Sequence, residues 1–258
     1  MTKKISEDKE YTSKIKISAI FVAFILVVGT ALQTTMILFP GQVLIEAFAD
    51  EVTGTDGDDD ISTGSEDDFN TGLGGDDNID SDGGSDLNTG DNFQGDGDGG
   101  DDSIDSGDGD DINTGDNDNG EGDGGDDTID SGDGNDQNVG DNSVGAGDGG
   151  DDKINSGDGK DFNVGDNFVG GGDSGDDKIK RGKGDDQNWG DNVDSSGDGN
   201  DKINAGQGDD ILTGGDGSDK FQCGSGEDDT TDYDPDEGDK ATGNCEDIEK
   251  GNGKGKNK

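Results

Sequence analysis

The chain has 258 residues, with 53 glycines, a hydrophobic fraction of 22%, and 67 acidic against 18 basic residues, which gives a formal net charge of −49. This charge excludes nucleic acid and anionic membrane surfaces as direct partners, because both would be repelled. The sequence contains no His, which excludes HExxH zinc sites and Ser–His or Cys–His nucleophiles. We therefore predict no enzymatic activity and no catalytic residues.

Residues 1–49 are predicted to direct export. Five Lys within residues 1–16 precede an apolar stretch at 17–39, and residues 47–49 form an Ala-Phe-Ala cleavage pattern. The apolar stretch is also long enough to span a bilayer, so an uncleaved signal anchor is the alternative to a signal peptide cut after Ala49. Both interpretations give a hydrophobic N-terminal helix and place the acidic part outside the cytoplasm. Residues 50–53 are predicted to be a short linker.

The nine-residue pattern G-G-x-G-x-D-x-U-x repeats through residues 54–222, and Gly214–Gln222 is its cleanest copy. The fifteen copies each carry Asp at the sixth position: Asp59, Asp68, Asp77, Asp86, Asp102, Asp111, Asp127, Asp136, Asp152, Asp161, Asp177, Asp186, Asp201, Asp210 and Asp219. The eighth position alternates between Ile and Asn from Ile61 to Asn188, and is Ile, Leu or Phe after that. A composition this acidic and rich in glycine is typical of disorder. A disordered tail does not require a regular nine-residue period, however, so the period argues against disorder.

The pattern resembles the RTX, or haemolysin-type, calcium-binding repeat over about two thirds of the chain. This resemblance implies an all-β fold, a parallel β-roll or β-helix solenoid in which each x-U-x is a short strand with one inward side chain. It also implies that several Ca²⁺ ions are bound by the fifteen Asp carboxylates together with turn carbonyls. The nine apolar side chains at the eighth position are too few to offset the entropy of ordering the array, so we expect a divalent cation to be required for folding.

Between residues 72 and 195 the repeat lengthens to 25 residues, because a seven-residue insert beginning Gly-Asp-Asn follows each pair of nonapeptides, and the last insert has six. The inserts form either a third face of a β-helix or protruding loops. Apolar residues recur in them, which favours the third face: Phe93, Val144, Phe168 and Val193. The alternate Asn residues predict either a buried amide hydrogen-bond ladder, which we favour, or a partly solvated face on which Asn caps turns.

Residues 223–249 are predicted to be a C-terminal cap, because a solenoid needs a polar end. The segment Asp232–Lys240 resembles one that often closes RTX arrays. Cys223 and Cys245 are the only cysteines, and in an exported chain they predict a disulfide. The basic tail 250–258 is predicted to be disordered, and either lies against the acidic array or contacts an anionic cell-wall component.

The sequence thus favours a secreted or cell-surface calcium-binding protein that folds on extracellular Ca²⁺ and has a structural or adhesive role. Its expected partners are calcium ions and cell-surface or surface-layer components, with no nucleic acid, and a membrane only through the N-terminal segment if that is uncleaved. The alternative function is that of a disordered acidic polymer that buffers cations or modulates mineral or ice growth. The regular Ile column favours the solenoid.

Overall fold

The computed structural model describes residues 35–39, 42–46, 50–91, 98–116, 122–142, 144–145, 147–170, 172–193, 198–226, 229–243, 245 and 247–248. The chain divides into two compact units, Met1–Ala49 and Asp50–Lys258. In the first unit, β1 (Thr35–Phe39) pairs antiparallel with β2 (Gln42–Glu46). The last five residues of the apolar stretch are therefore a strand, whereas the rest of the predicted signal helix and the Ala49 cleavage site lie outside the described residues. No helix in the described part of the chain is long and apolar enough to cross a membrane.

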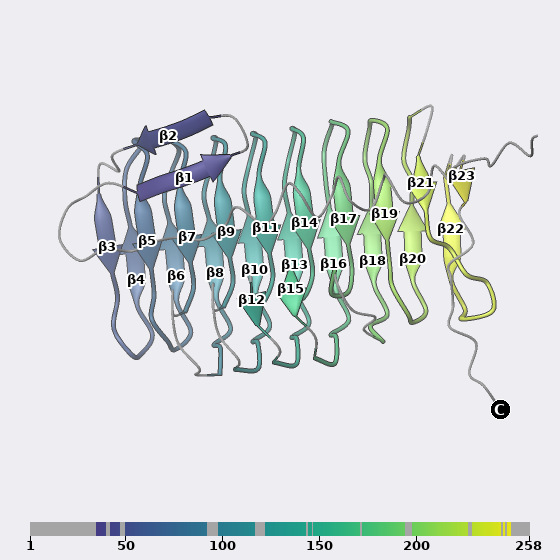
Figure 1. The fold of residues 1–258 in the computed structure, drawn as a ribbon, viewed down its shortest axis with the longest axis horizontal. Coiled ribbons are helices and arrows are strands. Elements are labelled where there is room, and N and C mark those ends of the chain that lie inside the picture. Colours follow the sequence, from purple (N-terminus) through teal and green to yellow (C-terminus); the bar gives the residue numbers. More distant parts are fainter. Residues whose placement is uncertain are drawn as a thin grey trace, which may run out of the picture. The chain divides into compact units, whose positions relative to one another are not determined.

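The second unit consists of two parallel sheets whose short strands alternate along the chain (Figure 1). The nine-stranded sheet contains, in spatial order, β4 (Asp60–Ser62), β6 (Asn78–Asp80), β8 (Ser103–Asp105), β10 (Thr128–Asp130), β13 (Lys153–Asn155), β16 (Lys178–Lys180), β18 (Lys202–Asn204), β20 (Lys220–Gln222) and β22 (Lys240–Thr242).

The ten-stranded sheet contains β3 (Glu51–Thr53), β5 (Phe69–Thr71), β7 (Leu87–Thr89), β9 (Ile112–Thr114), β11 (Gln137–Val139), β14 (Phe162–Val164), β17 (Gln187–Trp189), β19 (Ile211–Thr213), β21 (Thr230–Thr231) and β23 (Asp247–Ile248). Each coil of the chain thus adds one strand to each sheet. The all-β parallel solenoid predicted from the nonapeptides is confirmed.

The hydrophobic core is built mainly from one column of side chains of the nine-stranded sheet, to which Ala205, Leu212 and Cys223 add near the C-terminal end. The middle residue of each strand points inward, and pairing in register stacks Ile61 on Ile79 at 18-residue spacing and Ile79 on Ile104 at 25. The column contains Ile61, Ile79, Ile104, Ile129, Ile154, Ile179, Ile203 and Phe221. One buried Ile per coil is a thin core for a unit of this size, so polar interactions have to hold much of the solenoid together.

The Asn column of the ten-stranded sheet forms the predicted amide ladder. The Nδ2 atom of each Asn donates to the Oδ1 atom of the next, over 2.9–3.0 Å, from Asn70 to Asn188. All of these Asn side chains are fully buried. Because the chain repeats at this spacing, every inner amide both donates and accepts, which satisfies groups that would be costly to bury alone.

The inserts contribute a third strand face where the structure describes them. Strand β12 (Val144–Gly145) pairs parallel with β15 (Val169–Gly170) from the next insert. Beside them, Phe168 packs edge-on against Phe162 with ring centroids 5.4 Å apart, and Trp189 lies 4.9 Å from the same ring. Of the two alternatives for the inserts, this pair of strands supports the third face.

The solenoid extends beyond the predicted array at both ends. Residues 50–53 were expected to be a linker, but Glu51–Thr53 forms the first strand of the ten-stranded sheet, with Val52 in register with Asn70. At the other end β21, β22 and β23 continue both sheets past residue 222. The predicted disulfide joins Cys223 to Cys245. The tail at 250–258 lies outside the described residues.

Candidate metal centres

Two glycine-rich turns in each coil end at an Asp that immediately precedes a strand. We call turn A the turn before each strand of the nine-stranded sheet, and turn B the turn before each strand of the ten-stranded sheet. The Asp residues of turn A form column A: Asp59, Asp77, Asp102, Asp127, Asp152, Asp177, Asp201, Asp219 and Asp239. Those of turn B form column B: Asp50, Asp68, Asp86, Asp111, Asp136, Asp161, Asp186, Asp210 and Asp229.

All fifteen predicted ligand residues belong to these two columns, eight in column A and seven in column B. Asp59 is half-buried, and the other fourteen are buried. Asp50, Asp229 and Asp239 were not predicted, because they continue the columns at the ends, outside the nonapeptides.

One oxygen of each stacked carboxylate is used to hold the coils together. The backbone N–H of each Asp donates to the Oδ1 atom of the Asp in the next coil, as from Asp102 to Asp127 over 2.6 Å in column A. In column B the N–H of Asp136 donates in the same way to Asp161 over 3.1 Å. The Oδ2 atom makes no hydrogen bond in most buried residues of both columns: Asp77, Asp102, Asp127, Asp152, Asp177, Asp201 and Asp219 in column A, and Asp86, Asp111, Asp136, Asp161 and Asp210 in column B.

Turn A has a further row of acidic residues that sequence reasoning missed. The Asp of each Gly-Asp-Asn insert is buried beside column A, and these residues form column C: Asp91, Asp116, Asp141, Asp166 and Asp191. Each accepts a backbone N–H from turn A, as Asp116 does from Gly125 over 2.9 Å. The sequence does contain a pattern that points to column C, because every insert begins with the same three residues, Gly-Asp-Asn.

Columns A and C bring carboxylates close enough to share an ion. In one cluster Asp91, Asp102 and Asp116 each offer an oxygen, and these oxygens lie within 4.8 Å of one another. In the next cluster Asp116, Asp127 and Asp141 do the same, so Asp116 is shared by both. Each cluster combines inserts from two successive coils with the column A residue between them in sequence.

Backbone carbonyls lie next to these carboxylates. A Cβ added to Gly115 would overlap both the Oδ2 atom of Asp127 and the carbonyl oxygen of Gly140. Gly90 is placed in the same way against Asp102 and the carbonyl of Gly115. Only glycine therefore fits at the first position of the insert, and its absence of a side chain lets carboxylate and carbonyl oxygens converge.

The electrostatics of turn A strongly disfavour a metal-free, ionised state. Burial, together with repulsion from the neighbouring Asp91 and Asp116 carboxylates, raises the pKa of Asp102 to about 9. Burial, with repulsion from Asp116 and Asp102, also raises the pKa of Asp127 well above its ordinary value. Such carboxylates need either protons or a compensating cation.

Turn B has fewer carboxylates and more internal compensation. It has one buried Asp per coil, and a column of buried hydroxyls lies beside it: Ser81, Ser106, Ser131 and Ser156. Each Ser accepts from a ladder Asn, as Ser156 does from Asn163 over 3.1 Å. Burial raises the pKa of Asp161 to about 6, whereas the Asp136 N–H, Ser156 and Arg181 lower it.

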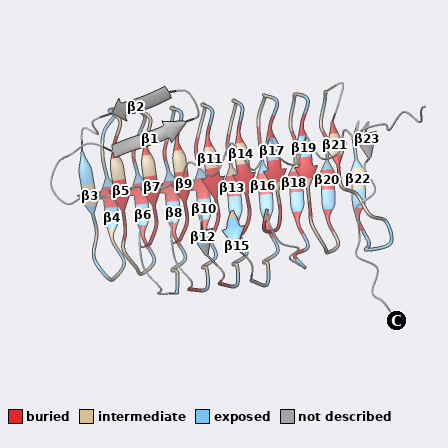
Figure 2. Ribbon diagram, viewed as in Figure 1, coloured by how far each residue is buried: buried red, intermediate tan, exposed pale blue. Residues whose placement is uncertain are grey.

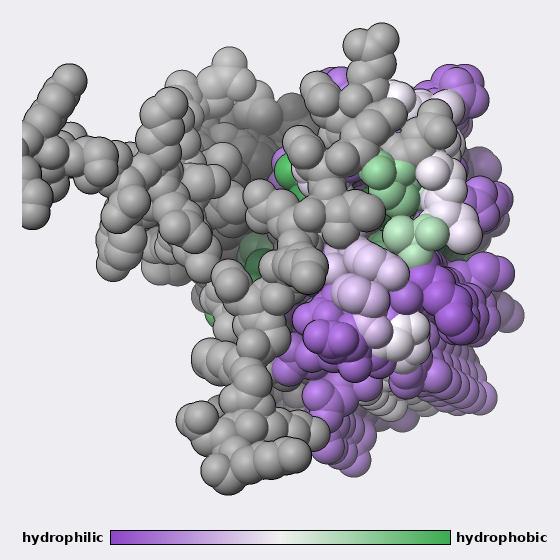
Figure 3. Space-filling view, turned by 90° about the vertical axis from the view of Figure 1, so that its right-hand side faces the viewer, coloured by the Kyte–Doolittle hydropathy of each residue, from purple (hydrophilic) through white to green (hydrophobic). Residues whose placement is uncertain are grey.

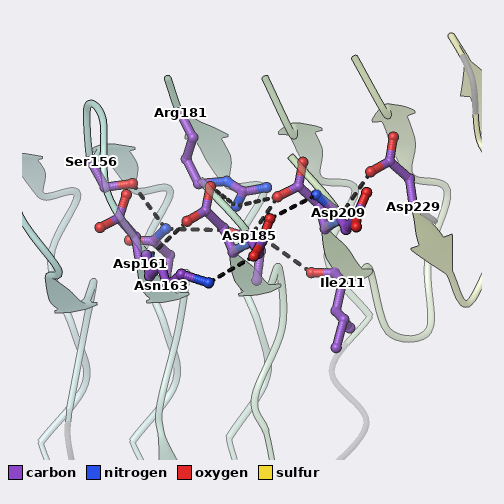
Figure 4. A network of polar contacts seen from close by, with 12 residues as sticks. Ser156, Asp161, Asn163, Arg181, Asp185, Asp209, Ile211 and Asp229 are labelled. Carbon is purple, nitrogen blue, oxygen red and sulfur yellow. Dashed lines mark hydrogen bonds and ion pairs between the residues drawn. The ribbon is translucent and has the colours of Figure 1, made fainter. Parts of the chain in front are cut away.

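Arg181 takes the place of Ser in the next coil of turn B (Figure 4). Its side chain is buried, and its Nη1 atom lies 2.8 Å from Asp186 Oδ2 and 3.6 Å from Asp210 Oδ1. Burial lowers the pKa of Arg181 to about 10, whereas Asp210 and Asp161 raise it. The guanidinium is thus a built-in cation between two stacked carboxylates.

The donor set fits a hard divalent cation. Turn A offers carboxylate and carbonyl oxygens, with two carboxylates per coil where an insert is present, so one divalent ion per coil balances their charge. No His is present, and both Cys are joined in the disulfide, so the soft or nitrogen ligands typical of zinc and copper sites are missing. Comparisons with protein-family models, curated proteins and solved structures gave no match for this chain.

Proposed function

We propose that this chain is an RTX-type calcium-binding solenoid whose fold depends on ions held in turn A. The observation that carries the proposal is the pair of buried three-carboxylate clusters that share Asp116. Buried carboxylates at this separation repel one another strongly, and each additional coil adds to the repulsion. A bound cation in each cluster converts that repulsion into the main attraction between coils.

Calcium suits these clusters better than magnesium does. Ca²⁺ accepts six to eight oxygen ligands in a flexible arrangement, whereas Mg²⁺ requires near-ideal octahedral geometry and retains several waters. Turn A supplies several oxygens from protein groups that are already buried, including the Gly115 and Gly140 carbonyls. A site whose ligands are protein oxygens rather than retained waters favours the larger cation.

We further propose that the protein acts outside the cytoplasm, in a structural or adhesive role rather than as an enzyme. The Cys223–Cys245 disulfide supports an oxidising compartment. Calcium affinities of extracellular modules are commonly weak, near 10⁻⁴–10⁻³ M, so ions would be bound after export and the chain would fold there. The predicted export segment at 1–49 is consistent with this order of events.

The test is far-UV circular dichroism of residues 50–258, titrated with CaCl₂ from a start in EDTA. The expected result is a cooperative rise of β signal with calcium, and no comparable rise with MgCl₂ at the same concentrations. A coil spectrum at every calcium concentration would refute the proposal and favour the disordered acidic polymer. Equal responses to the two ions would show that the clusters do not select calcium.

A further inference from the structure

The outer face of the nine-stranded sheet presents three residues per coil to solvent. They are the first and third residues of each strand and the residue two positions before the strand, as in Asp76, Asn78 and Asp80. Buried residues alternate with these, because successive side chains of a strand point to opposite faces. Figure 2 shows the strands of this sheet largely in the colour for exposed residues. We call this surface the outer A face.

Charge on the outer A face is separated along the solenoid. In the coils of β4, β6, β8 and β10 the three outward residues include two Asp and no basic residue: Asp58, Asp60 and Ser62; Asp76, Asn78 and Asp80; Asp101, Ser103 and Asp105; Asp126, Thr128 and Asp130. The central coil, that of β13, has Asp151, Lys153 and Asn155 and is neutral.

The last four coils of the face are positively charged. Their outward residues are Asp176, Lys178 and Lys180; Asn200, Lys202 and Asn204; Ser218, Lys220 and Gln222; Gly238, Lys240 and Thr242. Lys153, Lys178, Lys202, Lys220 and Lys240 stand in one register column of neighbouring strands. Formal charge per coil therefore runs from −2 in the first four coils, through zero, to +1 in the last four.

This arrangement is unfavourable within one molecule. Strands in a sheet lie about 4.8 Å apart, and like charges directly opposite one another on neighbouring strands destabilise it. Residues 50–249 contain only nine basic residues, and five of them are in this one column. Seen from the C-terminal end, hydrophilic residues cover most of the described surface (Figure 3).

We propose that the outer A face binds the outer A face of a second copy of this chain, with the two solenoids antiparallel. A two-fold axis along the strand direction, through the coil of β13, places coil one of each copy on coil nine of the other. Each acidic half then faces a basic half, and the contact is made twice, as a closed symmetric interface requires. The neutral coil faces its own copy at the axis.

The individual rows match as well as the total charges do. The row Ser218, Lys220, Gln222 meets the row Asp76, Asn78, Asp80, so that Lys220 projects toward a small neutral residue between two carboxylates. The row of Lys202 meets Asp101, Ser103 and Asp105 in the same way. A single ion pair at a surface contributes little, but a network repeated over eight coils contributes in every one.

A linear polyanion is the competing occupant, and the charge pattern favours the second copy. A polyanion would be attracted by the lysine half but repelled by the four acidic coils that share the same face. A partner with the same charge order, turned end for end, is attracted along the whole length. The inference requires only the folded solenoid, so it is separate from the proposal that calcium is the ion that folds it.

The first experiment is zero-length carbodiimide cross-linking of the full chain, folded in calcium with a non-ionic detergent present to cover the apolar N-terminal segment. Lys220 and Asp80 are six strands apart in one chain, roughly 29 Å at strand spacing, so a bond between them has to join two molecules. We expect Lys220 linked to Asp76 or Asp80, and Lys202 linked to Asp101 or Asp105. Lys202 also lies near Asp176 of its own chain, and that link checks the reagent.

Sedimentation velocity then tests whether the contact is specific. We expect a dimer at low ionic strength that dissociates near 0.5 M salt, where screening extends only a few Å. The double variant Lys202→Glu/Lys220→Glu should be monomeric, and mixing it with Asp80→Lys/Asp105→Lys should restore a dimer. The matched control, Lys160→Glu/Lys183→Glu, changes charge equally on exposed residues of turn B and should dimerise like the parent.

Three outcomes would overturn the proposal, provided that circular dichroism shows the folded solenoid. They are a parent chain that stays monomeric at low salt, intermolecular links confined to other residues, and an equal loss of dimer in the control variant. A monomer that binds an anionic polysaccharide through Lys202 and Lys220 would also overturn it, and would assign the face to a polyanion.

Discussion

Arg181 is the only buried cationic side chain in the part of the chain that the structure describes. We expect Arg181→Ser, which restores the residue found one coil earlier at Ser156, to destabilise the fold by about 3 kcal/mol at low calcium, because it leaves Asp186 and Asp210 buried without their cation. The loss should shrink as calcium rises, since an ion can take the guanidinium's place. Urea unfolding at several calcium concentrations measures both effects.

The matched control for this variant is Lys183→Ser, two residues from Arg181 in the sequence. It removes the exposed partner of Asp158. Surface pairs contribute little, so its unfolding midpoint should stay close to that of the parent. A loss for Arg181→Ser that is the same at every calcium concentration would mean that the guanidinium is an ordinary core ion pair. It would then have no relation to metal binding.

Residue-level chemistry was only partly visible in the sequence. The Asn ladder could be predicted because Asn recurs at one position of the repeat. A buried column of identical amides satisfies its hydrogen-bonding groups when each amide donates to the next. Arg181 was not recognised, because it replaces Ser at a position to which the nonapeptide pattern assigns no role. Aligning the 25-residue repeats would have shown Ser106, Ser131 and Ser156 followed by Arg181.

At the scale of the elements, turn A should be more sensitive to the loss of a carboxylate than any other part of the solenoid. Asp116 takes part in two clusters, so Asp116→Asn removes charge from both. We expect bound calcium to fall by two ions per chain, or the affinity of both sites to fall about tenfold, which corresponds to 1.4 kcal/mol each. A calcium electrode or isothermal titration calorimetry distinguishes these results.

Asp108→Asn is the matched control, because Asp108 is exposed in the same coil and carries the same charge. Its titration should resemble that of the parent chain. If both variants lose calcium equally, binding reflects general acidity rather than defined clusters, and the assignment of column C fails.

The elements also show where sequence reasoning stops. Strand positions and the fifteen stacked Asp residues could be predicted, because both depend on a local nine-residue period. The clusters of turn A could not, because Asp91, Asp102 and Asp116 meet only when coils of 25 residues stack. The choice between a third face and loops determines which side chains the inserts bury, and spacing alone does not decide it.

At the scale of the whole molecule, the solenoid holds carboxylates close together although they repel one another. Stacking provides each coil with backbone and amide hydrogen bonds, but it also lines up columns A, B and C along the entire length. The balance between these effects depends on what neutralises the carboxylates. Protons and divalent cations are the two candidates, and pH separates them.

In EDTA, we expect the solenoid to be favoured by acid and lost as pH rises. The pKa of Asp102 is raised by burial to about 9 and that of Asp219 to about 7, against an ordinary value of 3.8. A group whose pKa is higher in the folded state stabilises that state fully below its ordinary pKa, and the contribution disappears as pH passes through the raised value. The metal-free β signal should therefore be greatest near pH 4 and fall between about pH 6 and pH 9.

In saturating calcium the dependence should reverse, because protons compete with the ion for the same oxygens and binding requires ionised carboxylates. Circular dichroism in EDTA and in calcium, across one pH series at low protein concentration, should give curves of opposite slope. The Arg181→Ser chain should need more acid in EDTA to reach the same signal, since it has lost its built-in cation. Parallel curves in the two conditions would mean that the buried carboxylates do not control folding, and that the thin Ile column and the Asn ladder are sufficient without an ion.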